Sequence, residues 1–562
     1  MRKISGRFDL QYVSADRRRL HNRFDVCEYD CSSSVQILII VMDGFNLRNS
    51  TERDTFPEDT RVLQAMILSL RACINSDVPP IQVPGLIRTA RMRLSSVRDK
   101  LEMLSSNSST DKTLADFAEN LKNDLENGQF DSLRGFESRL SKLEQLAATT
   151  EPLTLAKVAE CRALVAAAMQ EHQLAADLCH QGAEIQELET VHRWHLVHLQ
   201  ATLLADYGRD FDDDAALQAS IDLLKRKILP LAEQLEEPHV LAASLQTLGN
   251  VLGMIGQRRN GTRYLEDAIS AFGEALERLN PDTESMQWAM VQNSLGNALG
   301  SLGQRCSDDT LLQQSIEAFE QALTKQSEKL CAHDWASTMN NLAAVLQSLG
   351  RKQSDPKLLK RSVNSYKAVL RVWTRTDVPL DWATTMDNLG TALRNLGEYR
   401  RGPGTLKQAV AAYNSALAER YRELVPNDWA MTNNNLGAAL HRLAQRVESS
   451  DIMHRATEAY EKTLTEWTRE KVPMTWAMTV ANLGVARREC AEMTGDIETA
   501  HKAVEEIQSA VDVFRSASHA QYTELGEEQL SKARLLLETL IAERDSEAIE
   551  DSTSTTTDCP VA

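Results

Sequence analysis

Five tryptophans recur in this chain at a constant interval of 47 residues, and an alanine follows each of them. Seven residues after each tryptophan stands a leucine, which is followed by glycine in four copies and by alanine in one. Self-similarity at a fixed period is typical of proteins built from stacked structural units. The 562-residue sequence therefore predicts a repeat array rather than a single globular core. The tryptophans are Trp288, Trp335, Trp382, Trp429 and Trp476.

The same register continues on the N-terminal side of Trp288. One interval earlier stand Leu241 and Ala242, and one further step reaches Trp194. We expect the array to cover residues 191–543, after a poorly interpretable segment at 1–60 and a helical N-terminal region, or cap, at 61–190. Residues 544–562 end in a serine- and threonine-rich stretch without apolar periodicity, and we predict that they form a disordered tail.

Each unit is predicted to contain two helices, because apolar residues recur at steps of three and four. The first, helix A, would begin at an aspartate such as Asp381, whose carboxylate can accept hydrogen bonds from first-turn amides, and would end at a left-handed glycine such as Gly397. The second, helix B, would begin at a cap such as Asp355 and carry small and aromatic residues at helical spacing. Small residues let helices approach closely, and aromatic side chains fill the remaining space. We interpret the periodic tryptophans as core residues between units.

Several marks together resemble the tetratricopeptide repeat: Leu-Gly pairs on helix A, small residues such as Ala409 and Ala456 on helix B, and an aromatic residue followed by Ala-Leu. The resemblance covers roughly the last two-thirds of the chain, and the asparagine-rich helix A is most similar to the long repeats of kinesin light chains and related bacterial proteins. The period exceeds the roughly 34 residues usual for the family. The resemblance implies an all-α fold, a right-handed α-solenoid of helix-turn-helix repeats with a helical N-terminal cap, in which helix A lines a concave groove.

Composition narrows the classes of partner. The chain has 80 acidic and 62 basic side chains, and its net charge of -18 repels nucleic acids and anionic membrane surfaces. None of the nine cysteines forms a CxxC pair, so neither a disulfide framework nor a zinc ribbon is indicated. The longest apolar run, residues 37–42, is too short to span a bilayer. We therefore expect a cytoplasmic protein that has no cofactor and no structural metal.

Few residues suggest catalysis. The sequence contains no HExxH, GxSxG or phosphate-loop motif. Residues 35–41 resemble one buried strand, but the N-terminal part offers no second strand of comparable strength to pair with it. His192, His195 and His198 stand at three-residue steps, as metal ligands on a helix can, although an ordinary, partly exposed helix is the simpler interpretation. We expect a protein without enzymatic activity.

Asparagines one or two residues before the leucine of helix A are the strongest candidates for a binding site. If they face the groove, their amides can both donate and accept hydrogen bonds along the backbone of an extended peptide. The alternative is that they bond to neighbouring repeats and stabilise the stack. Arg394 and Arg442, near the ends of the same helices, could select for carboxylates or could simply be solvated. The asparagines are Asn293, Asn340, Asn341, Asn388, Asn434, Asn435 and Asn482.

These features favour a non-catalytic scaffold that binds a peptide or helical segment of another protein in the groove. Two other interpretations stay open. The chain could be a signalling or effector protein with its activity in residues 1–146 and the repeats as a sensor, or it could be a self-assembling structural array. The sequence does not identify the partner, because one repeat fold supports many unrelated functions.

Overall fold

The computed structural model describes residues 83–554, except 107–111, 127–132, 149–150, 170 and 424. The chain divides into two units, residues 1–52 and 53–562, and everything described belongs to the second. This described part is helical and contains no strand, so the all-α class and the solenoid of paired helices are confirmed. The strand predicted at 35–41 and the segment 1–60 lie outside the described residues.

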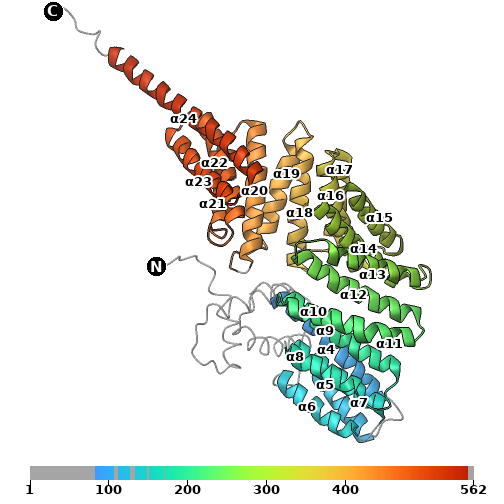
Figure 1. The fold of residues 1–562 in the computed structure, drawn as a ribbon. Coiled ribbons are helices and arrows are strands. Elements are labelled where there is room, and N and C mark those ends of the chain that lie inside the picture. The colour runs from blue at the N-terminus through green and yellow to red at the C-terminus, as the bar shows by residue number, and fades with distance from the viewer. Residues whose placement is uncertain are drawn as a thin grey trace, which may run out of the picture. The chain divides into compact units, whose positions relative to one another are not determined.

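The repeat array consists of alternating A and B helices, which Figure 1 shows following one another along the chain. The A helices are α12 (Pro238–Arg258), α14 (Ser285–Cys306), α16 (Ala332–Lys352), α18 (Pro379–Glu398), α20 (Pro426–Val447) and α22 (Pro473–Thr494). The B helices are α13 (Arg263–Arg278), α15 (Asp309–Lys325), α17 (Pro356–Val372), α19 (Gly404–Leu417), α21 (Ser450–Leu464) and α23 (Ile497–Ser516).

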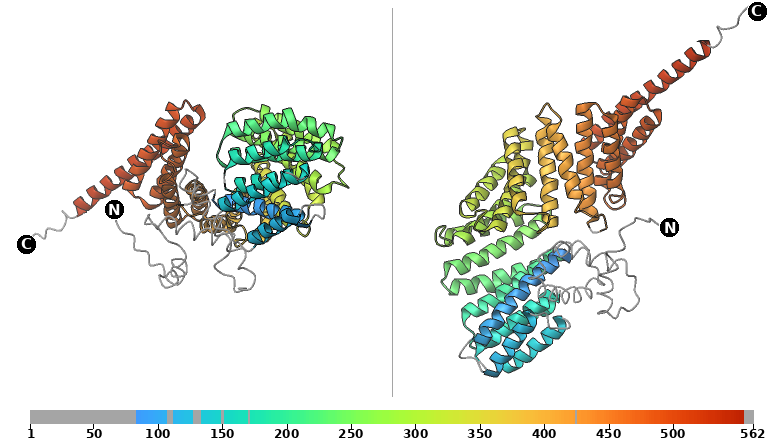
Figure 2. Two further views of the ribbon diagram at one scale, coloured as in Figure 1. Left: turned by 90° about the horizontal axis from the view of Figure 1, so that it is seen from below. Right: turned by 180° about the vertical axis from the view of Figure 1, so that it is seen from behind.

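Each A helix packs against the B helix of its own pair and against the B helix of the preceding pair. Successive A helices also contact one another, from α12 and α14 through to α20 and α22. The two views in Figure 2 show the helices of successive pairs lying side by side. The predicted aromatic residues of the B helices, Phe272, Phe319, Tyr413 and Tyr460, are buried, and so is Tyr366 at the same repeat position of α17.

A group of helices precedes α12, and the members from residue 191 onward lie within the predicted array at 191–543. The helices of the group are α4 (Val83–Ser106), α5 (Lys112–Glu126), α6 (Leu133–Ala147), α7 (Pro152–Ala168), α8 (His172–Ala183), α9 (Thr190–Asp210), α10 (Asp214–Leu223) and α11 (Leu229–Gln234), with a π-helical turn at Leu224–Ile228 between the last two. Helix α9 carries Trp194, whose indole N–H donates to Ser244 Oγ on α12 at 3.0 Å. Trp194, at the start of the predicted array, therefore connects α9 to α12.

Helix A begins earlier than the sequence predicted. In α18 the N-cap is Val378 and Pro379 occupies the first turn, so Asp381 lies inside the helix. Proline fits this position because first-turn amides have no partner within the helix and its fixed φ suits helical backbone. The carboxylate of Asp381 still lies where the helix dipole favours a negative charge. Asp355 is the N-cap of α17, as predicted, and accepts a hydrogen bond from the Lys357 backbone N–H at 2.7 Å.

The glycines near the end of helix A do not terminate it, contrary to the prediction. Gly303, Gly350 and Gly397 all lie within their helices. The left-handed residue that closes α14 is Ser307, with φ 54°. A Cβ at Gly397 would lie 2.7 Å from Cδ2 of Leu406 on α19, so this glycine allows helix B to approach closely.

Close approach also explains the glycine that follows the helix A leucine, and α12 offers a matched test. A Cβ at Gly249 would lie 2.5 Å from the ring of Phe272, whereas a Cβ at Gly253 would have no heavy atom within 4 Å. We expect Gly249→Ala to lower the free energy of unfolding by about 1–3 kcal/mol through overpacking. Gly253→Ala should raise it by up to about 1 kcal/mol, because alanine favours the helix. Urea denaturation followed by circular dichroism measures both, and equal effects would contradict the role of close packing.

The last helix, α24 (Ala520–Ser554), continues past residue 544, where the sequence predicted that the tail begins. Helix-favouring residues such as leucine, alanine, glutamate and arginine dominate residues 527–544, and neither glycine nor proline interrupts α24 after Gly526. The first part of the predicted tail is therefore helical, and residues 555–562 lie outside the description. Among the helices described, none has both the length and the apolar character needed to cross a membrane.

Candidate partner-binding face

The candidate asparagines lie on the A helices, in two positions of the repeat that recur along the array. The earlier position carries Asn293, Asn340 and Asn434, and the later position carries Asn341, Asn388, Asn435 and Asn482. All of them are partly exposed except Asn482, which is exposed. Because successive A helices contact one another, these side chains follow one face of the array from α14 to α22. We call this the A-helix face.

Some of these amides bond from one repeat to the next. Asn341 Nδ2 donates to Asn293 Oδ1 at 3.2 Å, which joins α16 to α14. Asn435 Nδ2 donates in the same register, at 3.2 Å, to Oδ2 of Asp387 on α18. Asn434 Oδ1 accepts from Thr479 Oγ1 at 3.5 Å. The inter-repeat bonding that the sequence left open as an alternative therefore occurs at part of the candidate set.

Other amides of the set are not engaged in this way. Among the residues that the structure describes, Asn388 and Asn482 have no hydrogen-bond partner, and Asn340 Oδ1 is buried without one. Exposed methionines, Met431 and Met478, stand one helical turn before asparagines of the later position, on the same side of their helices. The A-helix face thus offers both free amides and flexible apolar side chains, and Met478 stands one turn before the free amide of Asn482.

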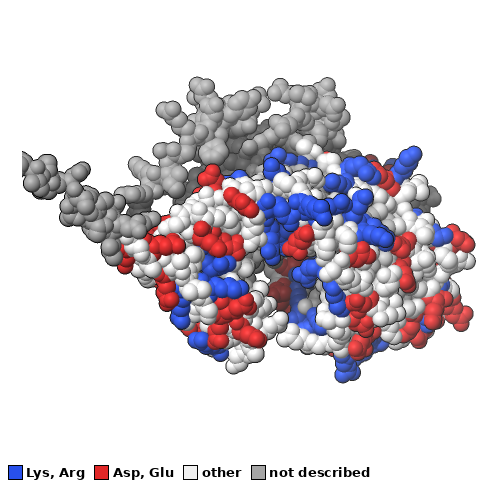
Figure 3. Space-filling model, turned by 90° about the horizontal axis from the view of Figure 1, so that it is seen from above, with Lys and Arg blue, Asp and Glu red and all other residues white. Residues whose placement is uncertain are grey.

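Charged side chains gather at the C-terminal part of the same helices. Arg394 is partly exposed and forms no ion pair with any described residue. Arg442 is exposed, donates to Gln445 Oε1 at 3.2 Å and lies 3.9 Å from the Glu398 carboxylate. On α22, Arg488 pairs with Glu489 at 3.1 Å. Although the chain is acidic overall, Figure 3 shows a face on which basic side chains gather near the middle and acidic ones dominate the outer parts.

One buried ion pair on the A-helix side was not predicted. Asp387 and Arg420 are each 3% exposed, and their side chains approach to 3.7 Å. Burial raises the pKa of Asp387, while the nearby Arg420 guanidinium opposes that rise. Arg420 also donates to Thr432 Oγ1 and, at 3.1 Å, to Thr384 Oγ1. The guanidinium therefore joins α18 and α20 at the centre of the asparagine series.

Alignment of the repeats by their 47-residue interval would have revealed this pair. Asp387 stands where other units have Asn293, Asn340 and Asn434. The residue 33 positions later is Arg420 in this unit, and it is Gln326, Trp373 or Trp467 in the units with those asparagines. An acid and a base thus replace two uncharged residues within the same unit, which is the signature of a compensating pair.

The periodic tryptophans are only partly buried, so their interpretation as core residues is too strong. The alanine after each one is fully buried instead: Ala289, Ala336, Ala383, Ala430 and Ala477. In the last three units an arginine lies over the indole ring, with 5.9, 5.5 and 5.6 Å between guanidinium carbon and ring centroid for Trp382, Trp429 and Trp476. These rings sit at the edge of the core beneath a cation.

The histidines of α9 make contacts within the fold. His195 Nε2 lies 2.8 Å from Glu160 Oε1, and His198 Nε2 lies 2.9 Å from Thr247 Oγ1. Within the described ranges, no cluster of three or more histidine, cysteine or acidic side chains is arranged to hold a metal ion. These contacts favour the interpretation of α9 as an ordinary, partly exposed helix.

Burial of a histidine next to α9 makes stability depend on pH. His172 is 6% exposed and packs against the rings of Tyr207 and Phe211. Burial, together with the positive charge of Arg93, lowers the pKa of His172 from 6.5 to about 4. Because the unfolded chain then binds the proton more readily, the stability contribution of neutral His172 is lost as pH falls from 6.5 towards 4.

We expect acidification from pH 7 to pH 5 to lower the free energy of unfolding of the wild-type protein by about 2 kcal/mol more than that of a His172→Phe variant. Phenylalanine keeps the aromatic packing but cannot bind a proton. Urea denaturation at the two pH values measures this difference. Equal losses in the two proteins would contradict the assignment.

Comparison with known proteins bears on the repeat. A family model described as tetratricopeptide repeat matches residues 335–370, which cover most of the α16–α17 pair. A comparison with curated proteins gave no match. Among solved structures, the human IFIT1 dimer with PPP-AAAA is 13% identical, with a TM-score of 0.36, over 91% of this chain and 100% of that chain.

Two further solved structures are similar at the same level. An IFIT1 monomeric mutant with m7Gppp-AAAA is 13% identical over 89% of this chain and 100% of that chain, with a TM-score of 0.39. BtubC from P. vanneervenii is 21% identical over 45% of this chain and 94% of that chain, with a TM-score of 0.32. At these TM-scores the similarities carry no argument about the ligands of this chain. The chain therefore contains a tetratricopeptide repeat at residues 335–370, and the matched pair α16–α17 recurs along the array with the same 47-residue period.

Proposed function

We propose that this protein is a non-catalytic interaction scaffold whose A-helix face binds an extended segment of a partner protein. The observation that carries the proposal is that Asn388 and Asn482 have unbonded side-chain amides, whereas Asn341 and Asn435, at the same repeat position, bond to the preceding repeat. These bonds between repeats hold neighbouring A helices together, so the free amides are held in position before a ligand binds. A preorganised site spends less free energy on ordering when it binds.

The chemistry of the face suits a peptide backbone. Each free amide can donate to a carbonyl and accept from an N–H, which are the groups that an extended segment presents whatever its sequence. Met431 and Met478 add flexible apolar contacts that adapt to different side chains. Arg394 and Arg442 would favour a segment with a carboxylate, because guanidinium–carboxylate hydrogen bonds are charge-assisted.

Residues 191–543 would carry this binding function, with residues 61–190 as the N-terminal cap. The effector alternative places the activity in residues 1–146, and the self-assembly alternative places it between copies of the chain. Truncation to 191–543 retains peptide binding under the scaffold proposal, provided that circular dichroism confirms that the fragment folds. Light scattering of the full chain tests self-assembly.

The direct experiment is a peptide-display selection on the full-length protein, followed by photo-crosslinking of the selected peptide. A photoreactive residue replaces Met431 on the A-helix face in one variant and Lys367 on the outer side of α17 in the other; both positions are exposed. We expect crosslinks from position 431 and none from position 367. Crosslinks from position 367 alone would assign the site to the B helices.

A further inference from the structure

The interface of α21, α22 and α23 departs from the packing of the preceding units. In those units, two leucines three residues apart on helix A are buried: Leu299 and Leu302, Leu346 and Leu349, Leu393 and Leu396, and Leu440 and Leu443. In α22, Arg487 and Cys490 stand at these positions. On α23, Glu506 and Ile507 replace the alanine–tyrosine pair that α19 and α21 carry. Polar or smaller side chains therefore occupy the place of four core residues.

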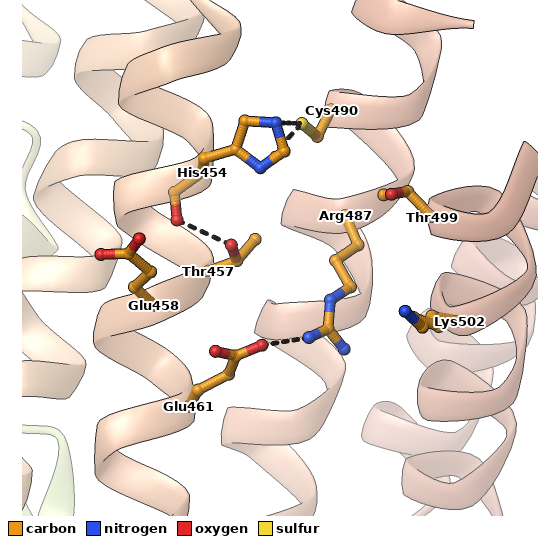
Figure 4. A pocket seen from close by; sticks show the side chains of 8 residues that line it. All are labelled: His454, Thr457, Glu458, Glu461, Arg487, Cys490, Thr499 and Lys502. Atoms are coloured by element: carbon orange, nitrogen blue, oxygen red, sulfur yellow. Dashed lines mark hydrogen bonds and ion pairs between the residues drawn. The ribbon is translucent and has the colours of Figure 1, made fainter. Parts of the chain in front are cut away.

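A pocket of about 370 Å³ lies where these replacements meet. Figure 4 shows its lining: α21 contributes one wall, α22 the floor and α23 the opposite wall. Because the walls come from two B helices, this pocket lies on a different side of the helices from the free asparagines. Its lining residues are His454, Thr457, Glu458, Glu461, Arg487, Cys490, Thr499 and Lys502.

Most of the charged side chains that line the pocket form ion pairs, and one does not. Arg487 binds two carboxylates, those of Glu461 and Glu506. Lys502 Nζ binds Glu498 Oε1 at 2.7 Å. Glu458 has neither an ion pair nor a hydrogen bond with any residue that the structure describes. The lining carries two acidic and two basic side chains, and both basic ones are paired, so Glu458 is the lining carboxylate left without a partner among the described residues.

The neutral groups in the pocket are compatible with a hydrogen-bond donor as ligand. His454 stands one helical turn before Glu458 on α21, and its ring nitrogens lie 3.5 and 3.8 Å from Cys490 Sγ. The Cys490 side chain is 1% exposed, and burial raises the pKa of its thiol, so the sulfur adds no negative charge that would attract a metal ion. Glu458 and the imidazole of His454 are hydrogen-bond acceptors among the lining residues.

We propose that this pocket binds an ammonium or guanidinium group, carried either by a small organic amine or by a lysine or arginine side chain of a partner segment. The group would donate to the Glu458 carboxylate in a charge-assisted hydrogen bond. The inference is independent of peptide binding at the A-helix face, because it uses none of the same residues. Either site can function if the other does not.

Isothermal titration of the full-length protein tests the proposal with three probes: putrescine, arginine amide, and an acetylated and amidated Gly-Arg-Gly peptide. We expect at least one probe to bind, and we expect Glu458→Gln to weaken its binding by about tenfold or more. Glu317→Gln is the matched control, since Glu317 is an exposed residue at the same repeat position on α15, next to an interface filled by Leu346 and Leu349. This control should leave affinity unchanged.

A second variant closes the pocket. Arg487→Leu, Cys490→Leu and Glu506→Ala together recreate the packing of the preceding units, and we expect a folded protein that has lost the binding. Binding of putrescine or arginine amide would identify a small amine as the ligand, and binding of the peptide alone would identify a partner side chain. The proposal is overturned if no probe binds the wild-type protein, or if Glu458→Gln and the closed variant bind as tightly as wild type.

Discussion

Arg420→Gln is expected to lower the free energy of unfolding by about 3–5 kcal/mol, because it leaves the Asp387 carboxylate buried without its cation. The two side chains are each 3% exposed, and Arg420 also donates to threonines on α18 and α20. Glutamine is a fair replacement, since Gln326 occupies the same position in another unit. Urea denaturation followed by circular dichroism measures the loss.

The double variant Asp387→Asn with Arg420→Gln supplies the control. It recreates the combination of Asn293 and Gln326, which another unit of the same chain already uses. We expect its stability to return to within about 1 kcal/mol of wild type, because no buried charge is left. If the double variant were as unstable as Arg420→Gln alone, the ion pair would not be the cause of the loss.

The repeat period made most of the fold predictable. Residues at the same position of successive units have similar surroundings, so the same residue type recurs there. The constant spacing of the tryptophans that starts at Trp288 therefore predicted both the array and the alternation of two helices. The B-helix cap at Asp355 was predictable for a local reason: an aspartate before a proline favours a helix start whatever the tertiary context.

Other features depend on contacts that a single helix does not reveal. Gly397 next to the end of a helical pattern looks like a left-handed terminator, but the structure uses it to admit Leu406 from helix B. Asp381 looks like a cap, yet the preceding proline already fits the first turn. Packing against helix B therefore decided the role of Gly397, and the proline in the first turn decided where α18 begins.

For the candidate site, the sequence indicated which asparagines to consider, but not which of them form hydrogen bonds to a neighbouring repeat. The asparagines of helix A are indistinguishable in sequence, but Asn341 and Asn435 bond to the preceding repeat, whereas Asn388 and Asn482 do not. The repeat period assigns all four asparagines to the same position, so it does not predict this difference in hydrogen bonding. The exchange of Asn for Asp at position 387 was visible in sequence, but only once the units were aligned.

The second large effect concerns partner binding. Asn388→Ala with Asn482→Ala is expected to weaken binding of a selected peptide by about tenfold or more, because two amides that would bond to its backbone are lost. Stability should change little, since neither side chain bonds to another described residue. The variant therefore separates loss of contact from loss of fold.

The most direct test of the account is the dissociation constant of that peptide, measured by fluorescence anisotropy with the full-length protein and two matched double variants. One is Asn388→Ala with Asn482→Ala on the A helices. The other is Asn364→Ala with Asn414→Ala, which removes two exposed asparagines from B helices α17 and α19. We expect only the first to weaken binding. Equal affinity of the first variant and wild type would contradict the assignment of partner binding to the A-helix face.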